Sequence, residues 1–345
     1  MPGCGGHWLR RLMMAAIASA CMLNLIAVDC LAGDDVLAQA NPLPTISLRP
    51  VERLEMAWNS EAAPDWPAAE VLATISKLTY LPPSTAEHRF RTLGFQRIRP
   101  FQANTLSGYV VSAGDVAVIG FRGTYDASEW LVNLGSLSYY TPEGDVHEGY
   151  YRAYRSLKPQ VLKLLAESRP RKIWITGHSL GGALALICAY DLMAEEKLKP
   201  YGLMTFGQPM VVDRFLAAHL DRQLLGRYVH FVNEEDIVPR LPPGFAHCGS
   251  LVWFTQGEIR RSPPKLRTPP RGPARVQSNH QDVLEPLSDQ EFAALQQQLE
   301  SAKGDSNSVV RTSATSRQAP LWIRDHSMTL YLEKIERISS PLESP

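Results

Sequence analysis

At the middle of the chain stands Lys172-Ile173-Trp174-Ile175-Thr176-Gly177-His178-Ser179-Leu180-Gly181-Gly182-Ala183-Leu184-Ala185. A short apolar run stops at Gly177, and a run rich in alanine and leucine continues to about Ala194. We expect a strand, a sharp turn and a helix, with Ser179 at the turn in a Gly-x-Ser-x-Gly pattern. A serine hydroxyl is a poor nucleophile unless it stands beside a base, and a helix N-terminus favours negative charge developing there. The stretch therefore predicts a nucleophilic serine. The plainer alternative is a glycine-rich turn with a solvent-facing serine.

The overall composition is that of a globular protein. The chain has 345 residues, of which 45% are hydrophobic and 20% charged, and this length allows one large domain or two small ones. Lys and Arg total 35, as do Asp and Glu, so no charge excess points to nucleic acid or to an acidic membrane surface. The five cysteines do not indicate a disulfide framework, because three lie before residue 31. We expect Cys188 to be a small core residue and do not expect a Cys188–Cys248 bridge.

The N-terminus has the layout of a secretory signal. Arg10 and Arg11 precede a nearly apolar run, and Ala38-Gln39-Ala40 offers a small-x-small cleavage site before Asn41. We therefore expect residues 1–40 to be removed and residues 41–345 to be exported, either secreted or periplasmic. Two alternatives remain: a retained N-terminal membrane anchor and lipidation at Cys21.

Strand and helix patterns alternate on both sides of Ser179. Residues 116–122 are apolar on both faces, as in a central strand of a covered sheet. The helix expected within residues 145–168 is interrupted near Pro159. The other expected helices are 67–80, 214–224 and 327–337, and the other expected strands are 94–98, 107–112, 202–207, 228–233 and 250–255. This alternation predicts an α/β fold with a mainly parallel central sheet and helices on both faces.

The composition changes at about residues 257–320. This stretch is first basic and proline-rich, then glutamine-rich with a helix expected at 291–298, then polar. We expect this low-complexity insertion to bury little surface and to be flexible in part. Its basic run is interpreted as a solvated loop, with contact to anionic lipid as the alternative.

The order of residues along such a fold suggests a catalytic triad. In an α/β sheet with a serine at this turn, an acid and then a histidine follow along the chain. Asp236 comes just after the strand 228–233, with Glu234 and Glu235 as competitors. The histidines beyond it are His247, His280 and His326, and His326 is best placed because it directly precedes the final helix.

Two further stretches belong to the predicted site. The strand 116–122 ends in Arg122-Gly123-Thr124, where the Thr124 amide and hydroxyl are placed to face an oxyanion beside the Leu180 amide. An ordinary Gly-Thr turn is the alternative. Residues 129–134 form a short amphipathic pattern with Trp130, Leu131 and Leu134. It is interpreted either as a lid over an apolar cleft or as a surface helix with Trp130 packed inward.

These motifs together resemble the class 3 (fungal-type) lipase family of the α/β-hydrolase superfamily. The resemblance runs in family order from about residue 68 to 335. It rests on Phe121-Arg122-Gly123-Thr124, Trp130-Leu131-Val132-Asn133-Leu134, His147-Glu148-Gly149-Tyr150, Gly177-His178-Ser179-Leu180-Gly181-Gly182, Phe206-Gly207-Gln208-Pro209, Asp236-Ile237-Val238-Pro239-Arg240-Leu241-Pro242 and Asp325-His326.

The resemblance implies an α/β-hydrolase fold without a cofactor or metal. It implies hydrolysis of triacylglycerol or a related ester, with a lipid or small ester as substrate, at a lipid–water interface. It assigns Ser179 as nucleophile, Asp236 as acid and His326 as base, with Thr124 and Leu180 at the oxyanion and a lid at Trp130. The chain departs from the family in lacking the disulfides of secreted fungal members and in carrying the 257–320 insertion. A phospholipase or another esterase, or a catalytically inactive surface-binding protein, remain alternatives, and the oligomeric state is left open.

Overall fold

The computed structural model describes residues 48–57, 64–124, 130, 134–264, 284–304 and 320–339. The chain divides into two compact units, Met1–Ser47 and Leu48–Pro345. The first unit, which holds the predicted signal peptide, lies outside the described residues, and every element below belongs to the second. Within the described ranges, no helix is both long enough and apolar enough to span a bilayer.

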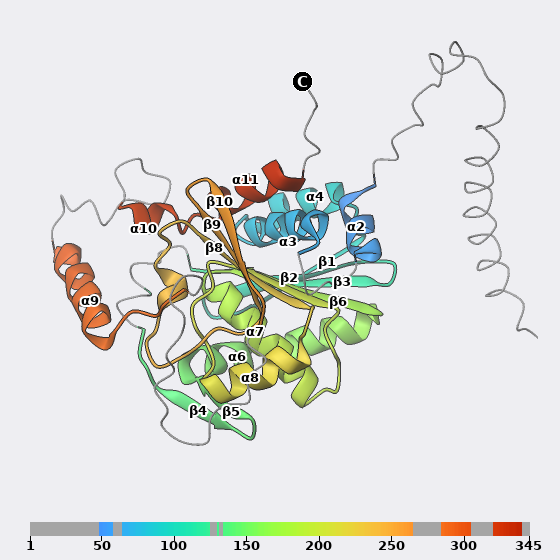
Figure 1. The fold of residues 1–345 in the computed structure, drawn as a ribbon. Coiled ribbons are helices and arrows are strands. Elements are labelled where there is room, and N and C mark those ends of the chain that lie inside the picture. The colour runs from blue at the N-terminus through green and yellow to red at the C-terminus, as the bar shows by residue number, and fades with distance from the viewer. Residues whose placement is uncertain are drawn as a thin grey trace, which may run out of the picture. The chain divides into compact units, whose positions relative to one another are not determined.

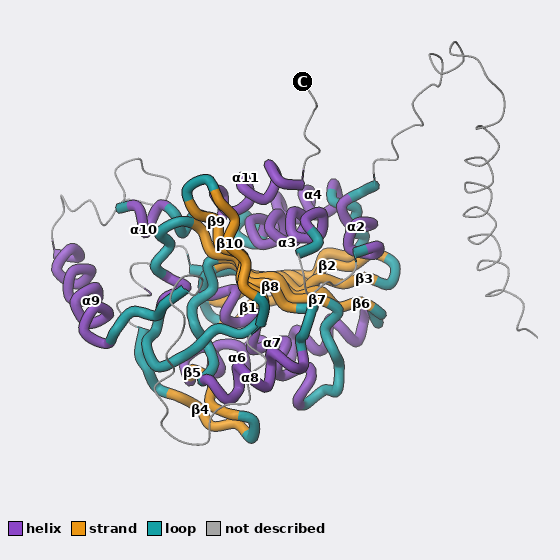
Figure 2. Tube along the Cα trace, in the orientation of Figure 1, coloured by secondary structure: helices purple, strands orange, loops and turns teal. Residues whose placement is uncertain are grey.

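A mainly parallel sheet runs through the second unit (Figure 2). Its described strands follow the order β1-β2-β3-β6-β7-β8-β9-β10. The five strands from β3 to β9 are parallel, whereas β1, β2 and β10 are antiparallel to their neighbours at the two edges. The bounds are β1 Arg97–Ala103, β2 Leu106–Ala113, β3 Val116–Phe121, β6 Lys172–His178, β7 Gly202–Phe206, β8 Tyr228–Asn233, β9 Ser250–Thr255 and β10 Glu258–Ser262. The hairpin β4 Ser138–Thr141 and β5 Gly144–His147 forms a separate small sheet. The predicted α/β architecture is confirmed.

Helices cover both faces of the sheet (Figure 1). One face carries α2 Pro50–Met56, α3 Trp66–Leu78, α4 Pro83–Thr92 and α11 Met328–Ser339. The other carries α6 Glu148–Ser168, α7 Leu180–Ala194 and α8 Arg214–Gln223. Side chains along β8 point alternately to the two faces of the sheet. Tyr228 belongs to the apolar cluster on the α7 side, and Phe231 belongs to the cluster on the α3 side. The remaining described helices are the 3₁₀ turn Val238–Arg240, α9 Asp289–Gly304 and α10 Leu321–Arg324.

Helix α6 is continuous where the sequence predicted an interruption. Pro159 lies inside the helix, in its middle turns. A proline removes one backbone hydrogen bond there, but apolar side chains hold both halves of α6 against the same core. These are Tyr150, Tyr154, Leu157, Val161 and Leu165, all buried. The burial of these side chains on both sides of Pro159 therefore outweighs the loss of one backbone hydrogen bond.

The insertion also differs from the expectation that it buries little. Helix α9 begins after Ser288, whose hydroxyl accepts from the Glu291 amide while the Glu291 carboxylate accepts from the Ser288 amide. Phe292, Leu295 and Leu299 follow at helical spacing and are buried. The glutamines between them conceal this apolar stripe when the segment is judged by composition alone. Residues 265–283 and 305–319 of the insertion lie outside the described ranges.

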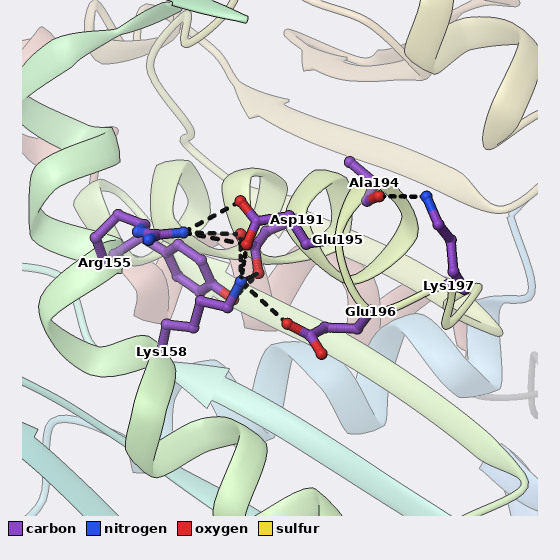
Figure 3. A network of polar contacts seen from close by, with 8 residues as sticks. Arg155, Lys158, Asp191, Ala194, Glu195, Glu196 and Lys197 are labelled. Atoms are coloured by element: carbon purple, nitrogen blue, oxygen red, sulfur yellow. Dashed lines mark hydrogen bonds and ion pairs between the residues drawn. The ribbon is translucent and has the colours of Figure 1, made fainter.

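An ammonium group joins α6 to the C-terminal end of α7 (Figure 3). Lys158 Nζ lies 2.9 Å from Asp191, pairs with Glu195 and lies 3.1 Å from Glu196. Burial lowers the pKa of Lys158, but its hydrogen bonds to Glu195, Asp191 and Glu196 outweigh burial and raise that pKa above its usual value. The three carboxylates are grouped as if to hold a cation, and the Lys158 side chain supplies that positive charge.

Replacing Lys158 by methionine should destabilise the fold by about 3 to 5 kcal/mol, because the buried Asp191 carboxylate loses its counterion. Urea unfolding of the purified protein measures this free energy. Arg155→Met is the matched control. Arg155 lies 3.8 Å from the same carboxylate, but its side chain is 46% exposed, so its loss should cost at most about 1 kcal/mol. Equal losses in the two variants would contradict the assignment.

Candidate active site

Ser179 occupies a strained turn between β6 and α7. Its φ of 58° and ψ of −130° are rarely adopted by residues other than glycine. The Ser179 amide donates to the Phe206 carbonyl at 3.0 Å, which ties the turn to the end of β7. A Cβ on Gly177 would lie 2.2 Å from the carbonyl oxygen of Gly181. Strand and helix thus cross more closely than a side chain permits, in the strand–turn–helix arrangement that the sequence predicted.

Asp236 and His326 meet although 90 residues separate them. His326 Nδ1 lies 3.0 Å and 2.9 Å from the two carboxylate oxygens of Asp236. Because a carboxylate only accepts hydrogen bonds, Nδ1 carries the proton and Nε2 keeps its lone pair. Both side chains are buried. This is the tautomer that a general base requires.

The sequence did not predict that Tyr331 holds the acid. The Tyr331 hydroxyl, on α11, donates to Asp236 Oδ2 at 2.7 Å and accepts from the main-chain amide of Asn233 at 3.0 Å. Burial raises the pKa of Tyr331 well above its usual value, so the phenol stays protonated and donates. The Val238 amide donates to the other oxygen at 3.0 Å. The only signal in the sequence was a tyrosine within the final helix, and a buried tyrosine usually finds a partner for its hydroxyl.

The competing residues lie elsewhere. Glu234 forms an ion pair with Lys334 on α11, and Glu235 is exposed. His247 Nε2 donates to the Pro239 carbonyl at 2.6 Å, so this nitrogen is already engaged. His280 lies outside the described residues.

The turn after β3 lies against Ser179. A Cβ on Gly123 would come within 3.2 Å of Ser179 Cβ, which places Thr124 one residue away. Within the described ranges, Ser179 Oγ, Thr124 Oγ1 and His326 Nε2 are buried and have no hydrogen-bond partner. Leu180 is the first residue of α7, where amides have no acceptor within the helix. Within this part of the chain, these three atoms are therefore available to bind a reacting group.

The segment proposed as a lid is described only at its ends. Trp130 is partly buried, and its ring stacks on Tyr150 with centroids 5.9 Å apart. Leu134 is buried, and its carbonyl accepts from Gln296 on α9 at 3.1 Å. Leu131 lies outside the described residues. Trp130 therefore packs inward in this structure, and lid motion stays a prediction.

The arrangement is chemically suited to nucleophilic attack on a carbonyl. It combines a serine hydroxyl, an imidazole with a free lone pair, a carboxylate that fixes the imidazole, and hydrogen-bond donors beside the serine. The residues that carry these groups follow strands β3, β6 and β8 or precede α11. The sheet therefore brings their segments together at the carboxyl ends of its parallel strands.

Part of the chain is similar to a known protein family. Residues 118–246 match the family model described as Lipase (class 3). This part of the chain is similar to the class 3 lipase family. The lipase of Rhizomucor miehei is 36% identical over 162 residues, which cover 42% of this chain and 44% of that protein. The secreted mono- and diacylglycerol lipase LIP1 of Malassezia globosa is 28% identical over 171 residues, covering 47% and 56%.

Among solved structures, the Rhizomucor miehei triacylglyceride lipase gives a TM-score of 0.49 at 28% identity, covering 57% of this chain and 84% of that one. The chain spans about half the length of the two curated relatives named above. The sheet order, the helices on both faces and the serine turn give the second unit an α/β-hydrolase fold.

Gly207→Ala should disable the site, because the new Cβ would stand 2.8 Å from Asp236 Oδ2 and 3.0 Å from His326 Nδ1. Displacing these groups should slow labelling of Ser179 by a fluorophosphonate on the order of 10²-fold. Gly244→Ala is the control, since both glycines have positive φ, +54° and +88°, but a Cβ on Gly244 meets nothing within 4 Å. If both variants labelled at equal rates, the close contact at Gly207 would have no bearing on the triad.

Proposed function

We propose that the protein is a serine carboxylester hydrolase of the lipase type. It cleaves acyl esters, triacylglycerol or a related lipid, at a lipid–water interface through an acyl-enzyme on Ser179. The observation that carries the proposal is the Asp236–His326 pair, whose geometry leaves Nε2 free in the same site as a strained, unpartnered serine. The relatives named lipase support the same class of substrate.

The reaction follows from the positions of these groups. Ser179 Oγ attacks the ester carbonyl while His326 Nε2 takes its proton, and Asp236 stabilises the imidazolium that forms. The Thr124 hydroxyl and the amides of Thr124 and Leu180 hold the oxyanion. The tetrahedral intermediate then expels the alcohol, which takes the proton from His326. Water then gives a proton to His326 Nε2 and attacks the acyl-enzyme. Ser179 Oγ leaves and takes that proton from His326, and the fatty acid is released.

Two other functions use the same fold. A phospholipase or another esterase would share the triad and differ in the pocket that receives the acyl chain and head group. A catalytically inactive surface-binding protein would leave the reactive atoms of Ser179, His326 and Thr124 without a role, although each is buried and unpartnered within the described part of the chain. The hydrolase proposal therefore gives these atoms a role that the binding protein does not.

We also propose that residues 1–40 direct export and that residues 41–345 form the mature hydrolase, secreted or periplasmic. The printed name of the Malassezia globosa relative describes a secreted protein, which supports this proposal. Intact mass and N-terminal sequencing of the exported protein test it, with a mature chain expected to begin at Asn41. A chain that kept residues 12–28 in the membrane fraction would favour the anchor instead.

Hydrolysis of para-nitrophenyl esters of short and long chains by residues 41–345 tests the proposed reaction. Ser179→Ala should lower kcat by about 10⁴-fold or more. Thr124→Val, which keeps the shape and the amide but removes one oxyanion donor, should lower kcat by about 10² to 10³-fold. Faster turnover of emulsified than of dissolved ester would identify a lipase rather than a plain esterase. A folded wild-type protein that neither hydrolyses these esters nor reacts with a fluorophosphonate would favour the binding role.

A further inference from the structure

His326 is held from a second side, through its backbone. His178 Nε2 lies 2.7 Å from the main-chain carbonyl oxygen of His326, and the two rings are 4.6 Å apart. A carbonyl oxygen only accepts hydrogen bonds, so His178 Nε2 must carry a proton. The residue that precedes the nucleophile thus donates to the residue that serves as base.

The Tyr80 hydroxyl fixes the state of His178. Tyr80 Oη lies 2.8 Å from His178 Nδ1. Burial, together with the neighbouring His326, lowers the pKa of His178 well below its usual value, so the ring is neutral. A neutral imidazole with its proton on Nε2 accepts at Nδ1, and Tyr80 is therefore the donor. The chain of hydrogen bonds runs in one direction, from Tyr80 to His178 to the His326 carbonyl.

The same hydroxyl lies against the oxyanion turn. A Cβ on Gly123 would be 2.2 Å from Tyr80 Oη. Gly123 immediately precedes Thr124, so Tyr80 contacts the turn that carries the proposed oxyanion donor. One tyrosine, two residues beyond the end of α3, is in contact with both the base-holding histidine and the oxyanion turn.

The His326 segment needs such restraint. It is a short connection between α10 and α11, and it follows the long insertion that separates it from Asp236. Asp236 fixes only the ring nitrogen Nδ1. The amides of Asp325 and His326 donate to carbonyls of α10. The carbonyls of this segment are held by side chains, that of His326 by His178 Nε2 and that of Asp325 by Asn233 Nδ2, which donates at 2.8 Å.

We propose that Tyr80 and His178 are positioning residues for the hydrolysis described above. Neutral His178 acts as a hydrogen-bond donor that sets the main chain of the base, and Tyr80 sets the tautomer of His178 while contacting the oxyanion turn. Neither residue exchanges a proton with the substrate. The kinetic part of this inference rests on the proposed function, whereas the geometric part does not.

Two substitutions of His178 separate the two ring nitrogens. In His178→Gln the side-chain amide nitrogen takes the place of Nε2 and keeps a donor for the His326 carbonyl. In His178→Asn the shorter amide takes the place of Nδ1 and keeps only the contact with Tyr80. The His178→Asn variant should lower kcat on a soluble para-nitrophenyl ester on the order of 10²-fold. KM should change little, because the substitution displaces His326 and leaves the substrate pocket intact. The His178→Gln variant should keep most of the wild-type kcat.

Tyr80→Phe gives an independent measurement if His178→Asn does not fold. It removes one donor from a partly buried side chain and should lower kcat about fivefold, the equivalent of one hydrogen bond. Equal losses for the asparagine and glutamine variants, or a loss confined to KM, would overturn the proposal.

A spectroscopic readout distinguishes failure of this inference from failure of the proposed function. The proton on His326 Nδ1 gives a proton NMR signal far downfield while it is held between the ring and Asp236. That signal should be lost or shifted in His178→Asn and kept in His178→Gln, whether or not the wild-type protein hydrolyses esters. An inactive wild type with this pattern would refute only the hydrolase. An unchanged signal in both variants would refute the positioning role.

Discussion

The contact between the backbones of β6 and α7 at Ser179 is the constraint on which the rest of the structure depends. Glycines at 177 and 181 allow strand and helix to cross without a Cβ between them, and Gly181 in turn lies against the Phe121 carbonyl at the end of β3. This crossing forces Ser179 into its strained conformation. It also brings the oxyanion turn beside the serine. The sheet and the buried helix α7 keep the geometry in place, because a strained backbone persists only where its surroundings determine it.

The site places its polar groups in the apolar interior and leaves several of them without partners. Asp236 is satisfied by His326, Tyr331 and a backbone amide. The reactive atoms of Ser179 and His326 are not satisfied within the described residues. Unpaired buried polar atoms reduce stability, and the ordered network around the acid offsets part of that loss. The proposed reaction uses the atoms that the fold leaves without a partner.

Much of the fold followed from local patterns in the sequence. A few consecutive residues suffice to predict three elements: the Gly-x-Ser-x-Gly turn, the apolar strand β3 and the amphipathic helix α3. The order serine, acid, histidine along the chain, which is not a local pattern, pointed to Asp236 and His326. Other features depend on side chains that meet only after folding. Tyr331 reaches Asp236 across 95 residues, and His178 reaches the His326 carbonyl across 148. The apolar face of α9 was hidden by glutamines, and the continuity of α6 through Pro159 reflects packing that no local pattern records.

Ser179 is the N-cap residue of helix α7, and the last turn of the same helix is joined to α6. The cation among the three carboxylates at that far end is part of the polypeptide. A dissolved ion would make this junction depend on its concentration, by mass action. A tethered ammonium has a fixed, very high local concentration instead. The C-terminal end of α7 is thus joined to α6 without a dissolved cation.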